Sequence, residues 1–195
     1  MEISLIRHGR SRLTDYKPIS CQQFKEWVKQ YDHHGVFKES SFPAETLEKI
    51  RNASVVLTSD LKRSIESAAI LNPPVEVRIN PLFRETELPT PSTNYPGLKL
   101  NPTLWAVLLR GLWLSGYSRN CESKQDVEAR ARRAAKVLMK YAHKHGQVVL
   151  VGHVFFNRLI AKELIIAGWR GKNTTSLKHW DCTTYSLIEN YRDGS

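Results

Sequence analysis

The stretch EISLIRHG, from Glu2 to Gly9, decides how we expect the rest of the chain to be organised. Its apolar first part is typical of a short buried strand, and the strand ends abruptly in Arg7-His8-Gly9. Open α/β folds bind their ligands at the carboxyl edge of the sheet, so a cation, an imidazole and a glycine at this place predict an anion site. Taken alone, the tripeptide also fits a strand end with two exposed polar residues.

Two later segments repeat this arrangement. Residues 54–58 (SVVLT) are predicted to form a second strand, with Asp60 at a helix N-cap and Arg63 in the first turn of that helix. A cation there opposes the helix macrodipole by about 0.3–1 kcal/mol, so Arg63 is easier to explain if it binds an anion. Residues 147–152 (QVVLVG) predict a third strand, which ends in His153 before another helix. One histidine at a strand end is usually structural, but two of them, with two arginines, indicate a shared site.

Strands and helices alternate through the remaining sequence. Helices are predicted over 22–34, 43–52, 61–71, 103–117 and 123–144 and between 153 and 168, and strands over 75–79 and 183–188. This alternation predicts an α/β fold, a three-layer sandwich with a mostly parallel central sheet. At 195 residues, the chain is expected to form a single domain, residues 1–195, around one core.

An insertion interrupts this alternation. Residues 89–102 contain several prolines and are not expected to form a regular element, and residues 103–117 predict a helix that is apolar on all sides. Such a helix is usually buried, although after a Pro-rich loop it fits a cap over a pocket or a dimer contact equally well. We therefore expect a cap-like insertion around residues 89–120.

The composition is that of an ordinary globular protein, with 41% hydrophobic and 25% charged residues. The 29 Lys and Arg against 19 Asp and Glu leave a net charge of +10, which attracts anionic partners, either a phosphorylated substrate or a nucleic acid. The helix that begins at the capping-box-like pair Ser123 and Asp126 is strongly basic. Its basic residues are Arg130, Arg132, Arg133, Lys136, Lys140 and Lys144. Because no aromatic residues alternate with them, we expect a solvated face rather than a nucleic-acid site.

The cysteines and the N-terminus bear on the compartment. Cys21, Cys121 and Cys182 show no CxxC spacing, so neither a disulfide framework nor a zinc site is expected, and free thiols fit a reducing cytosol. The first strand begins almost at Met1, without the pattern of a signal peptide. The most apolar stretch, residues 104–114, is too short to span a bilayer. We expect a soluble cytoplasmic protein without a membrane partner, and the oligomeric state stays open.

Four motifs, taken in order, resemble those of the histidine phosphatase superfamily, whose fold is phosphoglycerate mutase-like. They are Arg7-His8-Gly9, residues 58–64 (TSDLKRS), Arg84-Glu85 and Val151-Gly152-His153. The resemblance implies that His8 is the nucleophile and carries the phosphoryl group as a phosphohistidine. It also implies that Arg7, Arg63 and His153 surround that group and that Glu85 protonates the leaving oxygen.

The resemblance further implies phosphate contacts from Gly9, Thr14 and the backbone N–H of Val154. The chemistry agrees with these roles, since guanidinium groups match phosphate geometry and a carboxylic acid can donate a proton to the leaving oxygen. Cations of the protein would neutralise the phosphoryl group, so we expect neither a metal nor another cofactor.

The sequence departs from the family pattern at several positions. Thr14 stands where many relatives have Asn, Val154 stands where Gly is usual, and residues 88–91 (LPTP) replace a glycine-tryptophan-glutamate-glycine sequence. Glu87 shares a strand face with Glu85 and is an alternative acid. Glu85 could instead form an ion pair with a nearby arginine.

The expected function is hydrolysis of small phosphorylated metabolites. A mutase that uses the same phosphohistidine is one alternative, and a non-catalytic relative that binds anions or RNA is another. Specificity is expected to come from residues 13–40 and from the Pro-rich loop with its apolar helix, and neither segment identifies the substrate.

Overall fold

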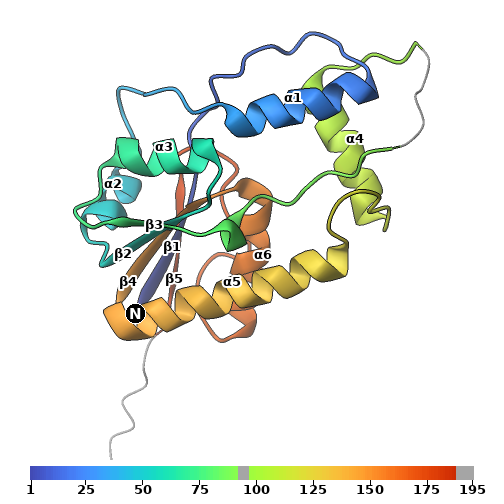
Figure 1. The fold of residues 1–195 in the computed structure, drawn as a ribbon. Coiled ribbons are helices and arrows are strands. Elements are labelled where there is room, and N and C mark those ends of the chain that lie inside the picture. The colour runs from blue at the N-terminus through green and yellow to red at the C-terminus, as the bar shows by residue number, and fades with distance from the viewer. Residues whose placement is uncertain (92–96, 188–195) are drawn as a thin grey trace, which may run out of the picture.

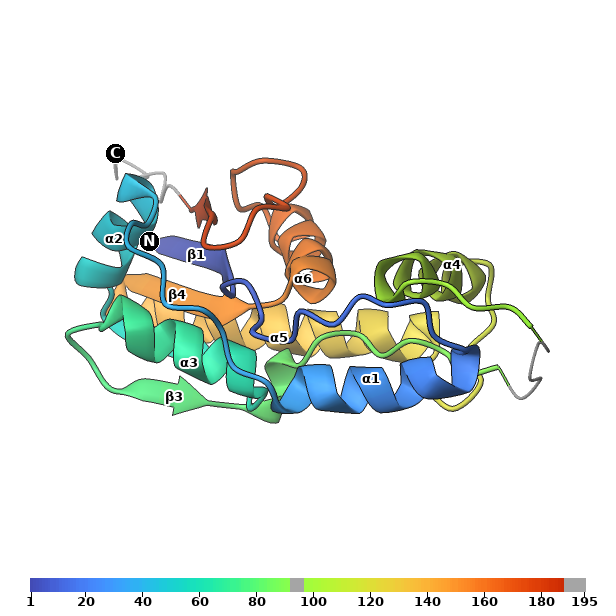
Figure 2. The ribbon, with the colours of Figure 1, turned by 90° about the horizontal axis from the view of Figure 1, so that it is seen from above.

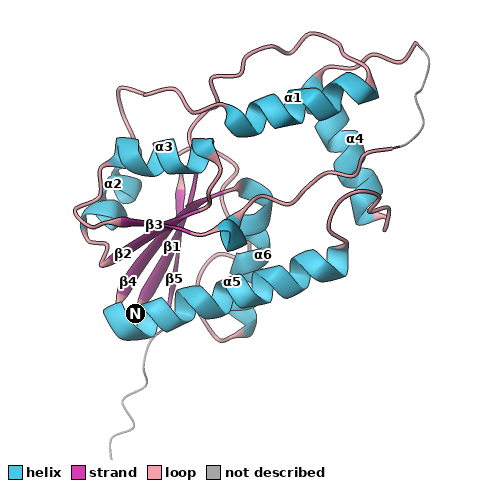
Figure 3. Cartoon of the chain, viewed as in Figure 1, coloured by secondary structure: helices cyan, strands magenta, loops and turns pink. Residues whose placement is uncertain are grey.

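The sheet that the sequence predicts is present in the computed structural model, which describes residues 1–91 and 97–187 (Figures 1 and 3). Five strands lie in the order β3-β2-β4-β1-β5, and all neighbours are parallel except β5, which is antiparallel to β1. Residue 188 of the predicted last strand and the polar tail after it lie outside the described residues. The strands are β1 (Glu2–Arg7), β2 (Val55–Thr58), β3 (Val77–Ile79), β4 (Gln147–Gly152) and β5 (Cys182–Ser186).

The register of the central strands brings three predicted motifs to one edge of the sheet. Arg7 lies opposite Gly152 in the parallel pair of β1 and β4, and Thr58 lies opposite Val151 in the pair of β2 and β4. The residues that follow these strands are therefore neighbours at the carboxyl edge of the sheet. The sequence predicted the candidate site at this edge.

Helices cover both faces of the sheet and complete the three layers (Figure 2). Alternate strand residues point to opposite faces. One face packs on α5 (Lys124–His145) and α6 (Val154–Ile166), through strand residues such as Leu5 and Leu150. The other face packs on α2 (Ala44–Arg51) and α3 (Lys62–Leu71), through strand residues such as Val56.

Helices α1 (Cys21–His33) and α4 (Pro102–Leu114) lie to one side of these layers (Figures 1 and 2). They pack on each other through a separate apolar cluster that contains Phe24, Trp105 and Leu109. The opposite face of α4 is exposed, so this helix is buried on one side only. Its exposed apolar residues are Leu104, Val107, Leu108, Leu112 and Leu114. Whether the insertion around residues 89–120 acts as a cap or a dimer contact stays a prediction, and residues 92–96 lie outside the described part.

Most helix ends agree with the sequence, but one N-cap prediction is wrong. Ser123 and Asp126 form the expected capping box of α5, and Gly146 ends that helix with a φ of 85°. The N-cap of α3, however, is Leu61 and not Asp60. The Asp60 carboxylate instead accepts a hydrogen bond from the Arg84 side chain at 2.6 Å, which also lowers the pKa of Asp60.

Two observations concern the compartment. The three cysteines are free. Within the described ranges 1–91 and 97–187, no helix has the length and apolar character that crossing a membrane requires.

Candidate active site

His8 follows β1 at the carboxyl edge of the sheet and is buried, with 3% of its surface exposed. Its Nδ1 lies 2.8 Å from the carbonyl oxygen of Gly9. Because a carbonyl only accepts hydrogen bonds, Nδ1 carries the proton and Nε2 keeps its lone pair. Burial, followed by the charge of Arg63, holds the pKa of His8 well below its usual value. His8 is therefore a neutral imidazole with a free nucleophilic nitrogen.

His153, at the end of β4, lies beside His8. The ring centroids are 5.2 Å apart, and His153 is fully buried. Burial and the charge of Arg63 also keep the pKa of His153 well below its usual value. Its Nε2 hydrogen-bonds to the Ser59 hydroxyl at 2.7 Å, while its buried Nδ1 has no hydrogen-bond partner within residues 1–91 and 97–187. The sequence analysis did not identify Ser59 as a site residue. Within the motif of residues 58–64, it assigned a role in the site only to Arg63.

The two predicted arginines, Arg63 and Arg7, both lie close enough to His8 for their positive charges to lower its pKa. Arg63 is 3% exposed, and Arg7 donates from Nη1 to the carbonyl of Leu177. The Nε atoms of both arginines are buried and have no hydrogen-bond partner in the part of the chain that the structure describes. Buried donors in native proteins are almost always paired, so these unpaired N–H groups beside His8 need an acceptor.

Helix α1 supplies two residues that the sequence did not connect with this site. Asp32 accepts a hydrogen bond from Nη1 of Arg63 at 2.7 Å. The Tyr31 ring stacks on Trp27, with centroids 5.2 Å apart, and its other neighbour is the guanidinium of Arg63, 4.6 Å from the ring centroid. From the sequence alone, the helical spacing of Trp27 and Tyr31 predicts only a packing role for them.

The Glu85 side chain lies at the N-terminus of α6, which begins directly after His153. Its Oε1 accepts from the backbone N–H groups of Phe156 at 2.9 Å and Thr86 at 2.8 Å, and its Oε2 accepts from that of Phe155 at 3.1 Å. A carboxylate is stabilised at this end of a helix. Burial lowers the pKa of Arg7, and the charge of Glu85 opposes this shift, so Glu85 is electrostatically coupled to the site. These backbone hydrogen bonds hold Glu85, and its carboxylate forms no ion pair with an arginine in the described ranges 1–91 and 97–187.

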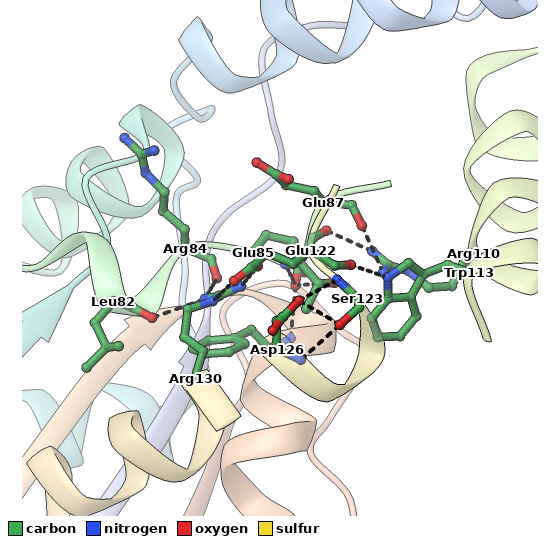
Figure 4. Close-up of polar contacts among 12 residues, drawn as sticks. Leu82, Arg84, Glu85, Glu87, Arg110, Trp113, Glu122, Ser123, Asp126 and Arg130 are labelled. Carbon is green, nitrogen blue, oxygen red and sulfur yellow. Dashed lines mark hydrogen bonds and ion pairs between the residues drawn. The ribbon is translucent and has the colours of Figure 1, made fainter. Parts of the chain in front are cut away.

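Glu87 differs from Glu85 in its surroundings. Its side chain is exposed, and Figure 4 shows its carboxylate pointing away from Glu85. The backbone carbonyls of Thr86 and Glu87 accept hydrogen bonds from Arg110 of α4, at 2.9 and 3.2 Å. The segment that carries both glutamates is thus attached to the insertion.

Arg130 of α5 holds the same segment from the other side (Figure 4). Its Nη1 donates to the carbonyls of Leu82 at 3.1 Å and Arg84 at 2.8 Å, and its Nε and Nη2 bind the Glu122 carboxylate at 2.8 and 2.6 Å. The prediction that Arg130 belongs to a solvated basic face is therefore wrong. It is 8% exposed because its hydrogen bonds compensate the cost of burying the charge.

The remaining predicted phosphate contacts have different environments. The N–H of Gly9 donates to the Ser67 hydroxyl at 2.8 Å, and a Cβ at Gly9 would lie 2.1 Å from the Trp180 ring. Thr14 is exposed, and Val154 is the first residue of α6. Phosphate binding by these three residues stays a prediction. Across residues 1–91 and 97–187, no three His, Cys, Asp or Glu side chains are grouped as metal ligands would be.

Comparison with known families adds to this geometry. The family model of the histidine phosphatase superfamily (branch 1) matches residues 40–195, a range that contains Arg63, Glu85 and His153. The match begins after His8, which the register of β1 and β4 brings to the same edge. In sequence, no curated protein matches the chain.

Several solved structures share the fold at low sequence identity. A mycobacterial glucosyl-3-phosphoglycerate phosphatase is 19% identical, with a TM-score of 0.55 over 85% of this chain and 79% of its own. A putative alpha-ribazole-5'-P phosphatase from Escherichia coli is 15% identical, with a TM-score of 0.60 over 97% and 92% of the two chains. The alpha-ribazole phosphatase from Shigella flexneri is 17% identical, with a TM-score of 0.55 over 97% and 92%. These similarities show a common fold.

Proposed function

Because the chain belongs to the histidine phosphatase superfamily, we propose that it hydrolyses small phosphorylated metabolites through a phosphohistidine formed on His8. One observation carries this proposal. Arg7 Nε, Arg63 Nε and His153 Nδ1 are buried beside a neutral imidazole and have no hydrogen-bond partner among the described residues. Leaving a buried donor unsatisfied costs about 1–3 kcal/mol, and the oxygens of a phosphoryl group would satisfy all three.

In the first half-reaction, Nε2 of His8 attacks phosphorus as the bond to the leaving oxygen breaks. The leaving oxygen takes a proton from Glu85, which must enter this step protonated. Oε2 is the better proton carrier of its two oxygens, because it accepts one backbone hydrogen bond and Oε1 accepts two. The products are the alcohol, the phosphohistidine and the Glu85 carboxylate.

In the second half-reaction, water attacks the phosphohistidine. Glu85 takes the proton from the water, the N–P bond breaks, and inorganic phosphate leaves with His8 neutral again. Arg7, Arg63 and His153 stabilise the phosphoryl oxygens in both steps. When the Ser59 hydroxyl donates its hydrogen bond to Nε2 of His153, the ring proton is on Nδ1. The Nδ1–H group then donates a hydrogen bond to a phosphoryl oxygen.

The proposal also covers metal independence and compartment. The two arginines supply the positive charge that a metal supplies in other phosphoryl-transfer sites, so activity is expected to persist in EDTA. The free cysteines fit a reducing compartment, and we place the enzyme in the cytoplasm.

The first test measures hydrolysis of p-nitrophenyl phosphate in EDTA by the wild type and by His8→Ala. We expect turnover only by the wild type, together with an acid-labile, base-stable phosphoryl group on the protein after rapid quenching. Equal turnover by both proteins would disprove the role of His8. Transfer of the phosphoryl group to a second metabolite in preference to water would instead indicate a mutase. Nanomolar RNA affinity with steep salt dependence and no turnover would indicate a binding protein.

The second test identifies the acid. A p-nitrophenolate leaving group needs little protonation, whereas an alkoxide needs a proton. Glu85→Gln is therefore expected to slow hydrolysis of an alkyl phosphate by about 10²–10⁴-fold and of p-nitrophenyl phosphate much less. Glu87→Gln is the matched control and should change neither rate. The reverse pattern would assign the acid to Glu87.

A further inference from the structure

Asp32 of α1 holds one end of the Arg63 guanidinium and leaves its side edge free. The Oδ1 atom of Asp32 accepts a hydrogen bond from Nη1 of Arg63 at 2.7 Å. Nη1 lies on the same side of a guanidinium as Cδ, whereas N–H bonds of Nε and Nη2 run side by side along the opposite edge. Nε is buried, and no residue in 1–91 or 97–187 is its hydrogen-bond partner. The edge that remains is therefore one whose two parallel N–H bonds can bind two phosphate oxygens.

Tyr31, the residue before Asp32, covers the flat face of the same guanidinium. Cζ of Arg63 lies 4.6 Å from the centroid of the Tyr31 ring, within the range of a cation–π contact. Burial raises the pKa of Tyr31, against the opposing charges of Arg63 and Arg7, so the ring stays an uncharged phenol at neutral pH. The ring contact restricts the tilt of the guanidinium plane, and the hydrogen bond to Asp32 restricts rotation within that plane. Two adjacent residues of α1 thus fix one side chain of α3.

Helix α1 is in turn anchored to α4 by a column of aromatic rings. Trp27 stacks on Tyr31 with centroids 5.2 Å and planes 15° apart, and Phe24 stacks on Trp27 at 5.9 Å and 11°. Trp105 of α4 lies next to Phe24, with centroids 6.5 Å apart. Helix α1 contacts α3 as well as α4 (Figure 1). The orientation of Arg63 therefore depends on a helix that belongs to none of the four sequence motifs.

The contact of Asp32 differs from that of a carboxylate that only compensates a buried charge. Arg130 is such a buried arginine, and it binds both oxygens of Glu122 through Nε and Nη2. Arg63 is also 3% exposed, but it binds one oxygen of Asp32 through Nη1 alone. The Asp32 side chain is 37% exposed, so water weakens its attraction to Arg63. The pair compensates the charge less completely and keeps the fork of N–H bonds available.

We infer that Asp32 and Tyr31 are positioning residues, which orient Arg63 so that its Nε–Nη2 edge meets two oxygens of the transferring phosphoryl group. The inference rests on the proposed function and adds α1 to the site. Orientation matters most in the transition state, where the phosphoryl oxygens lie in one plane and carry the charge that Arg63 stabilises. Loss of orientation should therefore lower kcat more than it raises KM.

Variants of Asp32 separate orientation from charge. Asp32→Ala should lower kcat about tenfold and change KM less than about twofold, because small misplacements at a reacting centre are costly. The loss should be equal for p-nitrophenyl phosphate and an alkyl phosphate, since Arg63 acts on the phosphoryl group and not on the leaving group. Asp32→Asn keeps an oxygen that accepts from Nη1 and should restore at least about half of kcat. A loss in Asp32→Asn as large as in Asp32→Ala would assign the role to charge and overturn the inference.

Two further variants are matched to these. Glu26→Ala removes a carboxylate from α1 where the side chain is 62% exposed, and it should leave kcat unchanged. Tyr31→Phe keeps the ring and should match the wild type, whereas Tyr31→Leu should lower kcat about threefold. Each protein is assayed well below its melting temperature, so partial unfolding does not enter. Equal kcat values for Tyr31→Phe and Tyr31→Leu, or an equal loss in Glu26→Ala, would contradict the inference.

Inhibitors give a readout that a merely structural role would not move. Orthovanadate takes up a trigonal-bipyramidal geometry like that of the transition state, whereas inorganic phosphate stays tetrahedral. In Asp32→Ala, the inhibition constant of orthovanadate should rise about tenfold and that of phosphate less than about threefold. An equal rise for both would mean that Asp32 supports the site without orienting Arg63 for the transition state.

The failure of this inference is distinguishable from the failure of the proposed function. Turnover by the wild type with unchanged kcat in both Asp32→Ala and Tyr31→Leu overturns the inference and leaves the phosphatase intact. No turnover by the wild type contradicts the phosphatase. Calorimetric titration with orthovanadate, which needs no turnover, then decides the inference separately, since equal affinities of the wild type and Asp32→Ala overturn it.

Discussion

Replacing Arg130 with Met should weaken both the fold and the acid step. Arg130 ties the N-terminal part of α5 to the segment that carries Glu85, through hydrogen bonds to the carbonyls of Leu82 and Arg84 and to the carboxylate of Glu122. Methionine keeps an apolar stem that can pack on the same surroundings but removes every donor. Arg130→Met therefore isolates the hydrogen bonds from the packing.

The structure allows the magnitude to be worked out. Removing one partner of a buried ion pair costs about 3–5 kcal/mol. The Glu122 side chain is 30% exposed, so water can solvate its carboxylate in the variant, which favours the lower end, about 3 kcal/mol. For a chain of this size, each kcal/mol shifts Tm by about 2–4 °C. Arg130→Met should thus lower Tm by about 6–12 °C.

The assay compares thermal unfolding and alkyl phosphate hydrolysis of Arg130→Met with those of Arg133→Met. Arg133 is one turn away on the same helix and exposed, so its loss should change stability by less than about 0.5 kcal/mol. Below its melting temperature, Arg130→Met should still hydrolyse alkyl phosphates more slowly, because Glu85 is less well fixed. If the two variants melt within about 2 °C of each other, Arg130 does not hold the segment and the reasoning is wrong.

Three further outcomes follow from the buried histidines and the glycines. The pKa values of His8 and His153 lie below 6.5 in the folded protein, so below that pH the unfolded chain binds protons that the folded chain does not. As the pH is lowered below 6.5, the free energy of unfolding should therefore fall by up to about 1.4 kcal/mol per pH unit for each histidine. In urea titrations, His153→Gln should make this fall less steep, whereas the exposed control His33→Gln should not. Parallel curves for the two variants would refute the prediction. Gly9→Ala should cost about 1–3 kcal/mol, because its Cβ would overlap a buried indole, and an unchanged Tm would contradict this. Gly111→Ala, in open space on α4, should raise stability by about 0.5–1 kcal/mol in the same measurement, and a lower Tm would count against an unhindered helical site.

The residues at the ends of the parallel strands were predictable from the sequence. Apolar runs define β1, β2 and β4, and the chain leaves each strand at the same edge of the sheet. The positions of His8 and His153 therefore follow from strand boundaries, and that of Arg63 also depends on the start of α3 after β2. Side-chain contacts are needed only to show which atoms are paired.

The supporting residues were harder to predict, for two different reasons. Arg130 carries a signal, because it is three residues after Val127 and four before Ala134, on the buried stripe of α5. Because arginine is charged, the sequence pattern assigned it to the solvent-exposed face of the helix instead. Asp32 carries no such signal, because its contact with Arg63 depends on how α1 is placed against α3, which is a tertiary contact.

Residues at strand ends are predictable from the sequence, and residues in loops are not. This difference explains why the reaction is easier to recognise than the substrate. Most of the residues that we propose to bind the phosphoryl group follow strand ends, which the hydrogen bonds of the sheet hold in fixed register. The chain continues beyond those strands in loops, and side chains of these loops would meet the rest of the substrate. Loops accept changes that a strand end does not, so one sheet can retain a single chemistry while its loops select different leaving groups. Specificity should therefore change first in these loops when this fold acquires a new substrate.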